Sequence, residues 1–145
     1  MSGFRLGRLV RLRERQEREE KLHWAAALRS VHAAQEQRAA GREALAQAHL
    51  DLMERVGEPS SPERRIAAET TLDHLGDRKV AQEQAVDAAT RGAEEARVPY
   101  DQRRREAEAL RRLEARWRQG RRKRRRRREE RDRQEHIARQ GGTQS

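Results

Sequence analysis

Cysteine is absent from this chain of 145 residues, and aromatic side chains make up only 3% of it. Without cysteine the chain can form neither a disulfide framework nor a thiolate metal site. Hydrophobic residues account for 33% of the sequence and charged residues for 41%. So few apolar side chains cannot fill a thick globular core, but a coiled-coil seam needs only about two of them per heptad. The composition therefore favours either long paired helices or a disordered chain.

Long apolar runs are also missing from the sequence. No stretch approaches the roughly 18 consecutive apolar residues that a transmembrane helix needs, and the N-terminus lacks the apolar segment of a secretory signal. We therefore expect a protein of the cytoplasm, which is also consistent with the lack of cysteine.

Turn-forming residues are concentrated between Val56 and Pro62. Elsewhere the good helix formers Ala, Glu, Arg, Leu and Gln dominate. Gly57 can end one helix in a left-handed conformation. Ser61 can cap the next helix, whose first residue would be Pro62, and the acidic Glu63 favours the positive end of the helix dipole.

These boundaries predict an all-α fold, a long antiparallel two-helix coiled coil whose second helix overhangs the first. The helices are expected over about residues 5–56 and 62–139, joined by a loop at 57–61. The tail at 140–145 is expected to be disordered. The whole chain would form one coiled-coil domain.

Heptad spacing defines the expected seam of the first helix. One seam position falls on Val10, Glu17, Trp24, Val31, Arg38, Leu45 and Leu52, and the other on Arg13, Glu20, Ala27, Ala34, Gly41, Ala48 and Arg55. From Ala27 to Ala48 the second position holds only Ala or Gly, which would let a partner helix approach closely.

The second helix carries a longer seam at alternating spacings of three and four residues. Its members are Leu72, Leu75, Lys79, Gln82, Val86, Ala89, Ala93, Ala96, Tyr100, Arg103, Ala107, Leu110, Glu114 and Trp117. Pro99 lacks a backbone donor and crowds the preceding turn, so we expect a kink near Arg97–Tyr100. The seam resumes in phase beyond it, which favours a kink over a helix end.

Folding the chain at a tight loop predicts which residues oppose one another. Trp24 would lie in the seam opposite Ala93, and the apolar cluster Phe4–Leu12 would lie opposite Arg105–Leu113. Residues beyond about 112 would then have no partner within the chain. Trp117, at the edge of this overhang, could serve either packing or binding.

Positive charge is concentrated near the C-terminus. Residues 111–139 contain fifteen lysines or arginines and five acidic residues, so this segment accounts for the whole net charge of +10. Up to residue 110 the chain contains twenty residues of each sign. The eight adjacent cations at Arg121–Arg128 repel one another, so we expect this part of the helix to fray without an anion or a partner.

Three interpretations of this cationic run remain open. It can be a solvated, partly disordered helix end. It can bind DNA or RNA non-specifically with a steep salt dependence, although neither base-stacking aromatics nor a recognisable nucleic-acid-binding domain accompany it. It can also dock on an acidic protein surface, where arginines make bidentate contacts with carboxylates.

Residue patterns of catalysis and of metal or cofactor binding are missing. The chain has no Gly-rich phosphate loop, and its carboxylates lie beside arginines on expected helix faces, where solvated salt bridges are the ordinary outcome. The histidines are not spaced as i,i+4 pairs and have no cysteine to complete a metal site; they are His23, His32, His49, His74 and His136. We expect no enzyme activity, no small-molecule substrate and no cofactor.

Three segments of the sequence match the pattern of one known protein family. Phe4–Glu14 resembles the start of its first helix, and Leu110–Arg116 resembles its Leu-x-x-Leu-Glu-x-Arg stretch. Arg133–Arg139 resembles its basic C-terminal ending, where Glu135 and Arg139 match the pattern. Together these segments resemble the FliJ family of the flagellar type III export apparatus.

The resemblance implies a cytoplasmic coiled-coil stalk that binds the hexameric export ATPase. It also implies contacts with the membrane export gate and with export chaperones, and a peripheral location at the cytoplasmic face of the membrane through the export apparatus. A stalk in a ring needs a narrow paired shaft and a charged end.

The expected partner-binding residues therefore lie at the paired ends and in the basic segment. They are Phe4, Leu6, Leu9, Leu110, Leu113, Trp117, Arg121, Arg122, Arg124, Arg125, Arg126, Arg127, Arg128, Glu135 and Arg139.

Other functions and assemblies are compatible with the same features. The chain could be a basic helical nucleic-acid-binding protein, a structural coiled coil of another secretion system, or a cytoskeletal adaptor. The helices could also pair between chains, because heptads do not fix the oligomeric state.

Overall fold

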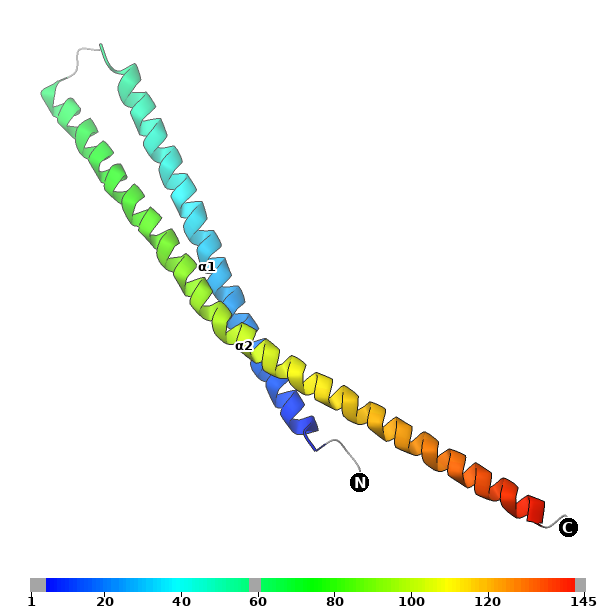
Figure 1. Ribbon diagram of the computed structural model, residues 1–145. Coiled ribbons are helices and arrows are strands. Elements are labelled where there is room, and N and C mark those ends of the chain that lie inside the picture. Colours follow the sequence, from blue (N-terminus) through cyan, green and yellow to red (C-terminus); the bar gives the residue numbers. More distant parts are fainter. Residues whose placement is uncertain (1–4, 58–60, 143–145) are drawn as a thin grey trace. The chain divides into compact units, whose positions relative to one another are not determined.

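The chain forms two helices, α1 (Gly7–Glu54) and α2 (Pro62–Gly142), in the computed structural model (Figure 1). The structure describes residues 5–57 and 61–142, and residues 1–4, 58–60 and 143–145 lie outside this description. No strand occurs within the described ranges. The prediction of an all-α helical hairpin is confirmed.

The helix ends differ from the predicted ones by a few residues. α1 begins two residues later and ends two residues earlier than expected, with turns at residues 55–57. α2 begins at Pro62 as predicted and continues through Pro99 to Gly142. Residues 140–142 are thus helical, contrary to the expected disorder, and 143–145 lie outside the described residues. A kink at Pro99 remains a prediction.

Local chemistry explains the helix ends on both sides of the loop. After α1 the chain tightens into i→i−3 hydrogen bonds, with the Arg55 amide donating to the Leu52 carbonyl at 3.2 Å. Gly57 then takes a positive φ of 108°, which an L side chain rarely adopts. At the start of α2, the Arg64 amide donates to Ser61 Oγ at 3.3 Å, which is the predicted N-cap.

Contacts divide the chain into two compact units, each built from both helices. The first unit comprises residues 1–18 and 102–145, and the second comprises residues 19–101. Each unit is described separately below.

The predicted seam faces are confirmed in both units. All fourteen seam residues of α2 are buried or half-buried, as are all those of α1 except Arg55. Val86 and Ala93 are the most buried in the second unit, at 6% exposure each. Val10 and Ala107 are the most buried in the first unit, at 5% and 0%. Because the seam is narrow, it buries few residues completely in the described chain.

The sequence prediction of the pairing register in the second unit is wrong. Trp24 stacks on Tyr100, with ring centroids 5.2 Å apart and planes 20° from parallel. Tyr100 lies about two helical turns beyond Ala93, the expected partner. Arg42 likewise reaches Glu83, at 3.4 Å. A shift of one heptad keeps the same faces in contact, so periodicity could not detect it.

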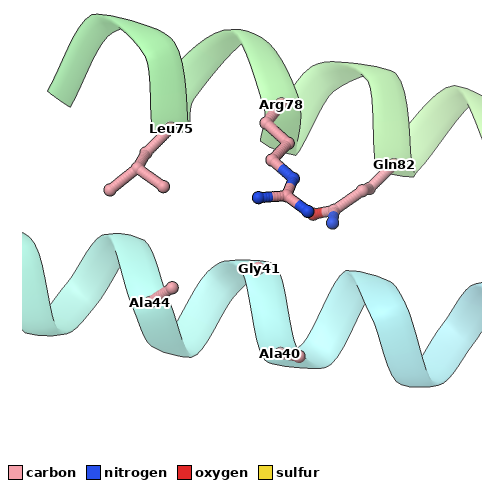
Figure 2. A pocket seen from close by; sticks show the side chains of 6 residues that line it. All are labelled: Ala40, Gly41, Ala44, Leu75, Arg78 and Gln82. Carbon is pink, nitrogen blue, oxygen red and sulfur yellow. The ribbon is translucent and has the colours of Figure 1, made fainter. Parts of the chain in front are cut away.

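Small residues of α1 leave a groove in the second unit, with an open volume of about 240 Å³ (Figure 2). Its lining consists of Ala40, Gly41, Ala44, Leu75, Arg78 and Gln82. Gln82 extends towards Gly41, where the methyl group of an alanine would clash with its Oε1. That oxygen is buried without a hydrogen-bond partner. The absence of a side chain at Gly41 therefore makes room for Gln82, while its Oε1 stays unsatisfied.

Gln82→Leu should stabilise the second unit, because it removes the unsatisfied oxygen and adds apolar surface beside Leu75. We expect the free energy of unfolding in urea to rise by about 1 kcal/mol. Gln84→Leu, at an exposed position of the same helix, is the matched control and should change it little. A loss of stability in Gln82→Leu would contradict the packing described here.

Candidate partner-binding end

The first unit contains all fifteen residues that the sequence marks as candidates for partner binding. We call its described residues, 5–18 and 102–142, the partner-binding end. Apolar packing here is sparse. Val10 of α1 and Ala107 of α2 are buried, and Leu6, Leu9 and Leu110 are half-buried. The small side chain of Ala107, which is 0% exposed, is consistent with a close approach of the two helices.

Charged side chains supplement this packing. Arg111 of α2 donates from Nε to Glu14 Oε1 at 3.1 Å and from a terminal nitrogen to Glu17 Oε2 at 2.7 Å. Glu14 and Glu17 lie one turn apart on α1, so a single guanidinium bridges both carboxylates. We call these three residues the arginine clamp. Glu17 is a seam residue, and its side chain is only 18% exposed.

A second polar network joins the same two helices. Arg13 of α1 donates to Glu106 of α2 at 2.9 Å, and Arg103 donates to the same carboxylate at 3.2 Å. Both arginines also donate to Gln16 Oε1, at 3.1 and 3.3 Å. Charged side chains can thus occupy seam positions of this end, because each has a hydrogen-bonding partner on the facing helix or on the same helix.

The arginine clamp holds its cation in the charged state. The hydrogen bond to Glu14 raises the pKa of Arg111, and the bond to Glu17 and the charges of both carboxylates act in the same direction. A raised arginine pKa contributes stability below the ordinary arginine range and loses it only above that range. Arg111 is therefore charged near neutral pH. The side chains of the clamp remain partly exposed, so solvent weakens the attraction.

Beyond the pairing with α1, α2 continues as an exposed helix. The guanidinium carbon of Arg121 lies 5.4 Å from the centre of the Trp117 ring, a cation–π contact. Every residue from 121 to 142 is exposed. The predicted fraying of Arg121–Arg128 is not found, because this segment is helical. Carboxylates follow the cations at i+4 spacing, and Arg125 pairs with Glu129 at 3.3 Å.

The comparison with protein families found a match over almost the whole chain. The chain matches the family described as Flagellar FliJ protein over residues 1–144. The chain belongs to the FliJ family. FliJ proteins are flagellar export-related, non-enzymatic components that interact with other parts of the export machinery. Searches of curated proteins and of solved structures found no match to the chain.

Family membership confirms the resemblance drawn from the three sequence segments, but it does not test the individual contact residues. In this FliJ-family chain, Leu6, Leu9, Leu110 and Trp117 are half-buried at the partner-binding end, and Leu113 is 44% exposed. Phe4 lies outside the described residues. The remaining predicted residues are exposed on one helical segment; they are Arg121, Arg122, Arg124, Arg125, Arg126, Arg127, Arg128, Glu135 and Arg139.

Sequence reasoning missed the arginine clamp. Glu17 was recognised as a seam position, but its partner could not be identified because Arg111 falls between the seam residues of α2. The i,i+3 spacing of Glu14 and Glu17 is common on helices and does not indicate a bridging cation by itself.

Neither a metal site nor a membrane span occurs in the part of the chain that the structure describes. Among those residues, no group of three or more His, Asp or Glu side chains is arranged to hold a metal ion. The described lengths of α1 and α2 also contain no stretch long and apolar enough to cross a membrane.

Arg111→Ala should destabilise the paired end by about 1 kcal/mol, because Glu14 and Glu17 would lose their shared cation and repel each other. Urea denaturation at low salt measures this change without screening charges. Arg112→Ala removes an adjacent exposed arginine and should change stability by less than about 0.5 kcal/mol.

Adding Glu17→Gln to Arg111→Ala should restore part of the lost stability, since only one carboxylate would then remain. Equal effects of the two alanine substitutions, or no rescue by Glu17→Gln, would contradict the bridging role of Arg111.

Proposed function

We propose that this chain is a stalk of the flagellar export apparatus that binds the export ATPase ring through its partner-binding end. It would help couple the ring to the export gate and to substrate chaperones. In this proposal the chain acts in the cytoplasm, at the inner face of the membrane, held there by the export apparatus.

One observation carries the proposal. The exposed helix at residues 121–142 extends past the last half-buried position and contains eight adjacent cations. Adjacent cations repel one another and destabilise the helix, so a contribution to folding stability does not explain this run. A partner that supplies carboxylates would turn the repulsion into bidentate hydrogen bonds. Together with family membership, this supports docking on an acidic protein surface of the export machinery.

The chemistry of this segment defines the kind of contact it would make. Apart from Ile137, which is 62% exposed, residues 121–139 carry no large apolar side chain. A contact made mainly by charges associates fast and weakens with salt. Trp117 and Leu113, just before the cationic run, would provide the apolar part of the same interface.

Other exposed apolar residues leave room for further partners. Leu22, Val80 and Val98 in the second unit are 67%, 53% and 66% exposed. Singly exposed apolar residues are common on protein surfaces. In an export component, however, they offer contact points for chaperones or the gate that do not compete with the partner-binding end.

Replacing the five residues Arg124–Arg128 with Gln should weaken binding to the export ATPase ring by about ten-fold or more, because several charge-assisted contacts are lost together. Stimulation of ATPase activity should fall with it. Binding can be measured by titration of the labelled chain with the assembled ring, and stimulation by phosphate release at matched occupancy.

The control is a variant that loses five positive charges from the second unit instead. It changes five exposed arginines to Gln, namely Arg29, Arg55, Arg64, Arg65 and Arg91. This variant should bind the ring nearly as well as the unchanged chain. Equal binding by the Arg124–Arg128 variant and the unchanged chain would refute the docking role.

Non-specific nucleic-acid binding is the competing function, and the same proteins test it. If duplex DNA bound more tightly than the ring did at physiological salt, with the same dependence on Arg124–Arg128, the cationic run would serve nucleic acid instead.

A further inference from the structure

A row of unpaired cations runs along one face of α2 in the first unit. Stepping from Arg105 by three or four residues, the positions follow one side of the helix. Six of the first eight positions are basic, namely Arg105, Arg112, Arg116, Lys123, Arg127 and Arg131. We call these six residues the cationic stripe. Ala109 and Gly120 occupy the two positions between them. One carboxylate, Glu130, lies three residues after Arg127 and falls on the same side near the end of the row.

The cationic stripe faces away from α1. Seam residues such as Ala107, Leu110 and Glu114 lie two positions from stripe residues, which on a helix places them on roughly opposite sides. The burial pattern agrees, since Ala107 is fully buried and all six stripe residues are exposed. The stripe is therefore accessible beside the paired part of this unit as well as along the exposed helix.

Several arginines on other faces of the same helix have ion pairs, which the stripe residues lack. Arg104 pairs with Glu108 at 3.1 Å, Arg125 pairs with Glu129 at 3.3 Å, and Arg111 bridges two carboxylates of α1. None of the six stripe residues has an ion pair or a side-chain hydrogen bond with another described residue. The neutralised cations thus lie on other faces, and none of them lies on the stripe. Arg122, Arg126, Arg128 and Arg133, on those other faces, also have no ion pair with another described residue.

We propose that the cationic stripe is a contact surface for an anionic lipid bilayer. At about 1.5 Å per residue, the row from Arg105 to Arg131 extends for about 40 Å. A flat bilayer can contact such a row along its whole length, whereas the phosphate backbone of a nucleic-acid duplex curves away from a straight helix. Mobile headgroups also supply phosphates wherever a cation lies, so no fixed pattern of carboxylates is needed.

The composition of the stripe specifies how the contact works. No large apolar or aromatic side chain occupies its positions, so the helix would not insert among acyl chains as an amphipathic helix does. It would adsorb by charge alone, with the small residues Ala109 and Gly120 letting the surface approach the backbone. Carboxylates on other faces, such as Glu114 and Glu129, would be directed away from the lipid. This proposal does not depend on docking to the ATPase.

The test compares two variants of the full chain that lose five cations each. The stripe variant changes Arg105, Arg112, Arg116, Lys123 and Arg131 to Gln. The flank variant changes five exposed cations on other faces of the same segment to Gln, and these are Arg122, Arg125, Arg126, Arg128 and Arg133. Circular dichroism verifies that both remain helical.

Binding is measured by co-sedimentation with vesicles of phosphatidylcholine containing phosphatidylglycerol, and with vesicles of phosphatidylcholine alone. The unchanged chain should bind only the anionic vesicles. The stripe variant should bind them at least about ten-fold more weakly, and the flank variant only about two- to three-fold more weakly.

Three results would overturn the proposal. One is failure of the unchanged chain to bind anionic vesicles, and another is an equal loss in the two variants, which would indicate a general effect of net charge. The third is a duplex DNA that binds the chain more tightly than the anionic vesicles do and depends on the same stripe residues, which would assign this face to nucleic acid.

Discussion

The narrow seam between α1 and α2 is the constraint on which the rest of the structure depends. A two-helix hairpin buries only one narrow face of each helix. Here many seam positions hold Ala, Gly or a charged residue. Only Val10, Val86, Ala93 and Ala107 are buried among the described hydrophobic residues. With so little apolar burial, specific polar and aromatic contacts have to contribute to pairing. The arginine clamp does so in the first unit and the stack of Trp24 on Tyr100 in the second.

The faces that meet were predictable from the sequence, whereas the register was not. Heptad spacing is a local property of each helix, so it identified the seam residues of both helices with the single exception of Arg55. Sliding one helix by seven residues places seam residues opposite seam residues again. Only contacts that do not repeat can choose among such registers. The aromatic stack and the fit of Gln82 over Gly41 are contacts of that kind.

The features of the candidate site were likewise predictable from the sequence where they belong to one helix, and not where they depend on how two helices are paired. The concentration of positive charge near the C-terminus was readable directly, and family membership confirms the resemblance that pointed to flagellar export. The arginine clamp was missed because its members come from two helices whose register was unknown. The expected fraying of Arg121–Arg128 was wrong, because counting adjacent like charges neglected the strong helix formers and the carboxylates that follow one turn later.

Disulfide cross-linking tests the seam and its register most directly, since the chain has no cysteine of its own. Ala27 and Ala96 lie one turn from Trp24 and Tyr100 and both belong to the seam. The register described here predicts that Ala27→Cys with Ala96→Cys forms a bond within one chain under mild oxidation. Ala27→Cys with Ala89→Cys should not. A bond between positions 27 and 89 in place of 27 and 96, or a covalent dimer from the first pair, would contradict it.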